Sequence, residues 1–242
     1  MSTKGQSIEI SGISVEVVRK DIKNLHLGVY PPNGSVRVAA PLRVSDDAVR
    51  LAVVTRLGWV RRQQKRFRAQ DRQSPREIVS GETHYFRGRR YRLEVIEAGE
   101  GIGVHRRSNG WLQLRVRPGS PRGVREKILT DWYREMLHED AEVLFRKWAP
   151  RVGVDVRHWA IRKMKTRWGT CNNRTGRIWL NVELAKKSKG CVELIVVHEL
   201  VHLLFRHHNE SFMKEMERHL PNWRSLRQEL NRAPLGHYGW DY

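Results

Sequence analysis

The sequence contains few cysteines. Its 242 residues include only Cys171 and Cys191. Two cysteines cannot form the disulfide framework of a small secreted domain, and a cysteine-rich structural zinc site needs four ligands. We therefore expect both side chains to be small buried residues in the core.

The sequence also lacks a long apolar run. No stretch approaches the roughly 18 consecutive apolar residues that a membrane helix needs. The opening residues, MSTKGQSIEISG, contain no apolar segment of the kind found in a secretory signal peptide. We therefore expect a cytoplasmic protein that does not act in a membrane.

Acidic residues are scarce relative to basic ones. The chain has 46 Lys and Arg against 26 Asp and Glu, a formal net charge of +20, yet 39% hydrophobic residues and nine tryptophans indicate a folded protein. Basic clusters with interleaved aromatic residues suit a nucleic-acid surface, and equally suit solvated faces without a partner. The candidate nucleic-acid-binding residues are Arg61, Arg62, Lys65 and Arg66, although no DNA-reading motif is present.

The pattern of elements predicts an α+β protein of two domains without an internal repeat. Residues 1–118 read as short strands and hairpins with one helix, which begins after an N-cap at Ser45. The run Pro118-Gly119-Ser120-Pro121 is the clearest break. We therefore predict a β-rich domain over 1–118 and a second domain over 119–242.

The second domain is predicted to contain both helices and strands. A long amphipathic helix begins near Val124 and ends before Pro150, and Arg177–Leu184 reads as a strand. A further helix carries the run CVELIVVHELVHLLF, whose apolar positions go all round, so this helix should be buried.

That buried helix contains an HExxH motif. His198 and His202 are four residues apart, so they lie on one helix face and can share a metal ion. Glu199 lies about 100° round the helix, beside the metal without being forced to ligate it. Three polar side chains in a buried helix would each cost about 1–3 kcal/mol if unpaired. Metal ligation accounts for all three together.

A third ligand is needed, and His208 lies six residues after His202. On a continuing helix six residues turn through about 600°, which would leave His208 roughly 240° away from the face of His202. The helix must therefore end between the two residues if both are to reach one ion, and Asn209 is a candidate for a left-handed break. His207 is the rival ligand. Weaker rivals are carboxylates from later helices: Glu215, Glu217 and Glu229.

HExxH with a third histidine is similar to the SprT-like and WLM metallopeptidases. Two further segments, Lys165–Cys171 (KTRWGTC) and Ile178–Asn181 (IWLN), resemble the RWGSC and I.LN elements of the YgjP-like metallopeptidase family, with Thr170 where serine is usual. The resemblance implies a minimal zincin-like catalytic domain with one zinc ion held by His198, His202 and His208. It also implies a catalytic Glu199.

Three protein ligands leave a fourth zinc position for water, whose proton Glu199 would accept as it attacks a peptide carbonyl. The candidates for a second oxyanion stabiliser are Arg167, His207 and Tyr238. Candidate substrate-binding residues are Arg167, Trp168 and Asn181, and the resemblance implies that the substrate lies along Arg177–Leu184 as an edge strand.

Two other functions compete with a zinc metallopeptidase. One is a metal-dependent nucleoside triphosphate hydrolase, but the sequence has no GxxxxGK[ST] loop and no acidic cluster for magnesium. The other is a nucleic-acid-binding protein with a structural metal site. Glu199 argues against it, because a closed structural site has no use for a non-ligating carboxylate.

Overall fold

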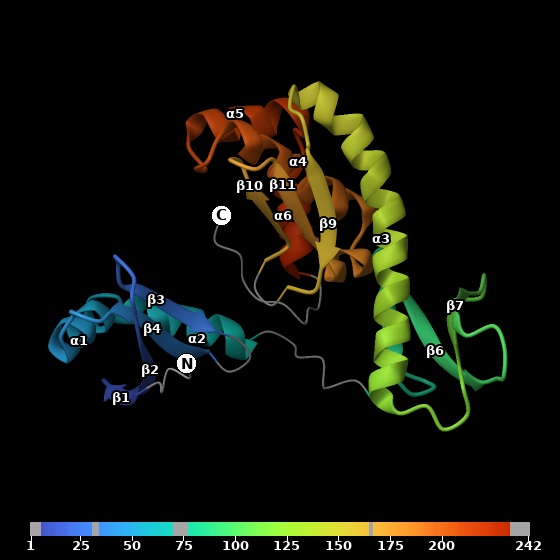
Figure 1. Ribbon diagram of the computed structural model, residues 1–242, viewed down its shortest axis with the longest axis horizontal. Helices are drawn as coiled ribbons and strands as arrows, with labels where there is room; N and C mark the ends of the chain where they lie inside the picture. The colour runs from blue at the N-terminus through green and yellow to red at the C-terminus, as the bar shows by residue number, and fades with distance from the viewer. Residues whose placement is uncertain (1–5, 31–33, 70–76, 165–166, 233–242) are drawn as a thin grey trace. The chain divides into compact units, whose positions relative to one another are not determined.

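The computed structural model describes residues 6–30, 34–69, 77–164 and 167–232. The chain forms two compact units, Met1–Arg72 and Gln73–Tyr242. Helices and strands are mixed in both units, which confirms an α+β protein (Figure 1).

The first unit is a four-stranded sheet with two helices. The strands are β1 (Gln6–Ile10), β2 (Ile13–Lys20), β3 (His26–Tyr30) and β4 (Ser35–Pro41), in the order β1-β2-β4-β3. Alternate residues of the central strands, such as Val15 and Val38, are buried in its core. The Ser45 hydroxyl caps α1 (Asp46–Thr55) as predicted, but the helix stops at Arg56 and α2 (Leu57–Ala69) begins anew.

The second unit begins with another four-stranded sheet. Its strands are β5 (Thr83–Phe86), β6 (Arg89–Glu97), β7 (Gly103–Arg106) and β8 (Trp111–Val116), in the order β5-β6-β8-β7. This order repeats that of the first sheet, with a parallel central pair in each. Both first hairpins turn through two residues with positive φ, Ser11-Gly12 and Arg87-Gly88. The topology is therefore repeated where the sequence shows no repeat.

The long helix α3 (Arg122–Val152) joins this sheet to the rest of the second unit (Figure 1). Residues three or four apart, from Leu129 to Val152, form its buried stripe. Pro150 lies in the last turn, and the helix ends at Gly153 with φ 76°, a few residues later than predicted.

The third sheet and four short helical segments complete the second unit. The strands are β9 (His158–Arg162), β10 (Gly169–Asn172) and β11 (Arg177–Asn181), in the order β10-β11-β9. The helices are the 3₁₀ segment η1 (Val182–Lys186), α4 (Lys189–Leu204), α5 (Glu210–His219) and α6 (Trp223–Arg232).

The division at residues 72/73 differs from the predicted boundary at 118/119. Leu112 and Leu114 of β8 belong to the same core as Leu129 of α3, and the Tyr133 hydroxyl of α3 donates to the Tyr85 carbonyl at 2.9 Å. The Pro-Gly break after β8 is thus a turn between elements that share one core, not a linker.

Within the described part of the chain, no helix has the length and apolar character required to cross a membrane.

Candidate metal centre

The candidate site is built on α4, which is buried on nearly all sides as its apolar sequence predicts. Ser188 caps its N-terminus by accepting a hydrogen bond from the Cys191 N–H at 3.3 Å. His198 and Glu199 are only 6% and 2% exposed. Polar groups buried to this degree require partners, because an unpaired one is costly.

The chain leaves α4 before the third histidine. The helix ends at Leu204, and Phe205 is extended with φ −129° and ψ 116°. Asn209 caps α5, since its side-chain oxygen accepts from the Phe212 N–H at 2.9 Å. The predicted helix end between His202 and His208 is confirmed. Asn209, however, is extended with φ −80° rather than left-handed.

The fold brings three imidazoles together, those of His198, His202 and His208. Their Nε2 atoms are 3.1 Å (His198–His202), 3.2 Å (His198–His208) and 3.0 Å (His202–His208) apart. Three nitrogen ligands about 2.0–2.1 Å from one tetrahedral zinc would be about 3.3 Å apart. The donor set and its spacing therefore fit such an ion. Among the described residues, this is the one group of at least three His, Cys, Asp or Glu that could hold a metal.

The imidazoles are oriented and kept neutral by their surroundings. The His202 Nδ1–H donates to the Phe205 carbonyl at 3.0 Å, which leaves Nε2 as the free acceptor. Burial lowers the pKa of His198 well below its ordinary value and also lowers the pKa of His202 and of His208. The Phe212 ring packs against all three, with centroids 4.7–5.0 Å away.

Glu199 is held beneath β10 by a close contact with Gly169. A Cβ atom at Gly169 would lie 2.5 Å from Glu199 Oε1 and 2.7 Å from Cγ, so only glycine leaves room for the carboxylate. Burial raises the pKa of the Glu199 carboxyl to about 8, and the positive charge of Arg167 opposes that shift. The sequence pattern places Gly169 in the KTRWGTC segment but gives no sign of its contact with Glu199.

The rival ligands lie elsewhere. The exposed side chain of His207 is outside the three-imidazole group. Glu215 pairs with His219 at 3.0 Å, and Glu217 accepts from Trp223 Nε1 at 2.9 Å. Glu229 lies on α6, on the side of Cys191 and Lys187.

Two of the candidate substrate-binding residues are structural. Asn181 is fully buried, and its amide donates to the Met164 and Arg167 carbonyls at 3.1 and 2.7 Å. It therefore shapes the segment before β10 and cannot touch a substrate. Trp168 is also fully buried, whereas Arg167 is exposed.

The expected edge strand is in the middle of its sheet. β11 pairs with β10 on one side and with β9 on the other. Both sets of its backbone groups are thus used, so a substrate cannot pair with it. Of the two outer strands, β10 contacts α4 more extensively.

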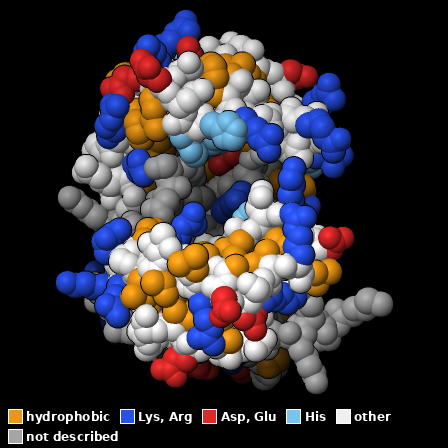
Figure 2. Space-filling view, turned by 90° about the vertical axis from the view of Figure 1, so that its left-hand side faces the viewer, with side chains coloured by type: hydrophobic (Ala, Val, Ile, Leu, Met, Phe, Trp, Pro, Cys, Tyr) orange, Lys and Arg blue, Asp and Glu red, His pale blue; other side chains and the backbone are white. Residues whose placement is uncertain are grey.

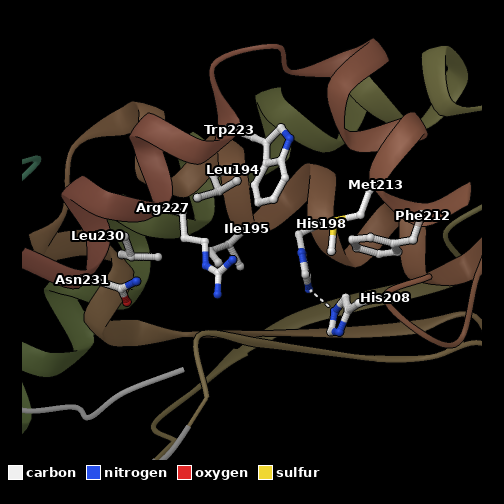
Figure 3. A pocket seen from close by; sticks show the side chains of 10 residues that line it. All are labelled: Leu194, Ile195, His198, His208, Phe212, Met213, Trp223, Arg227, Leu230 and Asn231. Carbon is white, nitrogen blue, oxygen red and sulfur yellow. Dashed lines mark hydrogen bonds between the residues drawn. The ribbon is translucent and has the colours of Figure 1, made fainter. Parts of the chain in front are cut away.

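A narrow pocket adjoins the imidazoles between α4, α5 and α6 (Figure 3). Ile195, Phe212 and Trp223 form its apolar wall, and Arg227 of α6 points into the same space as His198 and His208. The amphipathic pattern of α6 gave no sign that Arg227 reaches this site.

The candidate nucleic-acid residues lie on α2 of the first unit. Arg61, Arg62 and Lys65 are exposed. The side chain of Arg66 and the whole of Tyr238 are outside the described part of the structure. Figure 2 shows Lys and Arg side chains interspersed with hydrophobic and acidic ones.

Comparison with known proteins gives a family and a set of solved structures. The profile of the YgjP-like metallopeptidase domain matches residues 23–233. A crystal structure of the metallopeptidase zymogen of Pyrococcus abyssi abylysin matches 39% of this chain and 91% of that chain, with 21% identity and a TM-score of 0.34, a likeness too low to carry an argument. No curated protein matches.

Proposed function

Because this chain belongs to the YgjP-like metallopeptidase family, we propose that it hydrolyses peptide bonds with one zinc ion held by His198, His202 and His208. The observation that carries the proposal is the convergence of three imidazole Nε2 atoms within 3.2 Å of one another. Three neutral nitrogen donors favour zinc over magnesium or calcium, which prefer oxygen ligands. Three ligands also leave a coordination position open, as in catalytic zinc sites.

Zinc, when bound, acidifies water and polarises a carbonyl group. Glu199 would then accept a proton from the attacking water at its carboxylate and deliver it to the leaving amine. A nearby divalent cation favours the ionised carboxylate, against the effect of burial on its pKa. The close contact with Gly169 fixes the position of the carboxylate during both transfers.

Arg167 is the best candidate for the second oxyanion stabiliser. Its side chain is exposed, and its charge acts on the Glu199 carboxyl. The Asn181 side-chain amide positions the Arg167 backbone by donating to its carbonyl oxygen at 2.7 Å. His207, the rival, is also exposed; it follows the end of α4, and its charge acts on His202 and His208 rather than on Glu199.

The substrate would lie along β10 rather than β11. The Asn181 N–H donates to the Trp168 carbonyl at 2.8 Å, so every second residue from Trp168 onward forms its backbone hydrogen bonds with β11. Gly169 and Cys171 then direct their backbone N–H and C=O groups away from β11. An extended peptide that pairs with these groups would pass next to Glu199, the residue that Gly169 contacts.

The test compares wild type, Glu199→Gln and His198→Ala for zinc content and for cleavage of an unfolded protein. Glu199→Gln keeps the shape of the side chain, so zinc should stay while cleavage falls by about 10²–10⁴, the usual contribution of a general base. His198→Ala should lose both zinc and activity. Loss of zinc from Glu199→Gln would make Glu199 a ligand, and unchanged cleavage would place the base elsewhere.

The same preparations should be assayed with nucleoside triphosphates. Hydrolysis of these, with no cleavage of protein and with the same dependence on Glu199, would favour the rival hydrolase over a peptidase.

A further inference from the structure

A second cavity lies in the same unit, between the β5–β8 sheet and α3. Its volume is about 470 Å³, within the size range of ligand sites. It is lined by Arg87, Arg106, Arg107 and Arg115, with Trp132 and Met136 of α3, and no carboxylate takes part in the lining.

The positive charge of this cavity is poorly balanced from within the chain. Arg87 is neutralised by Asp140, at 2.8 and 3.0 Å. The Arg107 guanidinium donates to the neutral Gln113 side chain, at 2.7 Å, and forms no ion pair with a described residue. Within the described residues, Arg106 and Arg115 make no ion pair, and the buried Nε of Arg115 has no hydrogen-bond partner. Guanidinium groups placed together in this way favour an anionic ligand.

The cavity adjoins a free sheet edge. β7 is the outer strand and pairs only with β8 among the described strands. The Arg107 N–H donates to the Trp111 carbonyl at 2.9 Å, so alternate residues of β7 bond to β8. Val104 and Arg106 therefore direct their backbone groups outward, and both line the cavity.

We propose that β7 and this cavity form a docking site for an acidic, extended segment of a protein substrate. Backbone pairing with Val104 and Arg106 would hold the segment as an added strand. Its carboxylates would meet Arg106, Arg107 and Arg115, and its apolar side chains would face Trp132 and Met136. A free sheet edge and an apolar wall favour a peptide over a phosphate-rich polyanion, which needs neither. That the bound segment belongs to a substrate rests on the proposed peptidase function.

Binding can be measured without turnover, in the full chain carrying Glu199→Gln. The probe is a fluorescein-labelled peptide of alternating valine and glutamate, followed by anisotropy. Arg106→Gln should weaken binding about tenfold, the loss expected for one charge-assisted hydrogen bond. Arg90→Gln is the matched control: Arg90 is exposed on β6 of the same sheet but does not line the cavity. It should leave the affinity unchanged.

Val104→Pro tests the edge separately. It removes one outward N–H while every arginine stays, and proline is tolerated on an edge strand at such a position. Affinity should fall in protein that still unfolds cooperatively, and the melting temperature should drop only by the partial loss of Val104 packing against the core. Equal binding of the same peptide with glutamine in place of glutamate would overturn the proposal. Two other results would also overturn it. One is an equal loss of affinity in Arg90→Gln. The other is tight binding of tripolyphosphate that depends on Arg106, together with no binding of the peptide. A failure of catalysis would leave this measurement unaffected.

Discussion

The closest contact in the candidate site offers the sharpest test: Gly169→Ala. The new Cβ would lie 2.5, 2.7 and 2.9 Å from Oε1, Cγ and Cδ of Glu199, all shorter than real Cβ contacts allow. Glu199 is 2% exposed, so it has little room to move away. Overpacking of this kind costs about 1–3 kcal/mol. Gly169 does not have a positive φ, so backbone strain is not part of the effect.

For a unit of this size, about 1–3 kcal/mol corresponds to a melting temperature lower by roughly 2–12 °C. Cleavage should fall further than stability explains, because the displaced carboxylate no longer meets the attacking water. Zinc should remain bound, since the histidines are not in this contact. The measurements are a thermal melt, zinc content and the rate of protein cleavage.

Gly123→Ala is the matched control, because a Cβ at Gly123 meets nothing within 4 Å. A double variant sharpens the test. Glu199→Ala removes the three atoms nearest to the new Cβ, so adding Gly169→Ala to it should cost much less than Gly169→Ala alone. Two results would refute this contact as the constraint on Glu199. One is a melting temperature and cleavage rate of Gly169→Ala equal to those of wild type. The other is the same loss of stability from Gly169→Ala in wild type and in Glu199→Ala.

Three further predictions concern the ligands, the support of Arg167 and the basic helix. His208→Ala should lower zinc affinity far more than His207→Ala, as measured by competition with a chelator; the reverse would move the third ligand by one residue. Asn181→Leu should destabilise the protein by about 1–3 kcal/mol, because buried backbone carbonyls lose their donor; an unchanged denaturation midpoint would contradict this. If α2 binds nucleic acid, Arg61→Glu with Arg62→Glu should reduce its affinity and salt dependence without loss of zinc.

The sequence predicted α4 and its break well because both follow from local periodicity. Apolar residues on all sides of a helix indicate burial, and the six-residue step from His202 to His208 is incompatible with a continuing helix. The predicted left-handed conformation of Asn209 was wrong. Asparagine suits both a left-handed turn and an N-cap, and only the start of α5 decides between them.

Local periodicity cannot predict which strands that are distant in the sequence pair with one another. Arg177–Asn181 reads as a strand, but its place between β9 and β10 depends on partners that the sequence does not specify. The Pro-Gly turn near residue 118 predicts a domain boundary that the fold does not have, because a turn signal does not reveal which elements share a core. Asn181 looked like a site residue because its burial could not be read from its position in a motif.

Gly169 links the two halves of the proposed site. Its missing side chain leaves room for Glu199 on α4, and its backbone groups face the open edge of β10. A substrate strand paired at this residue would be placed relative to Glu199, the proposed base, by one backbone position, not by a chain of flexible side chains. Such placement costs little conformational entropy when the substrate binds. On this reasoning, the tight packing of β10 on α4 is a requirement of the chemistry as well as of the fold.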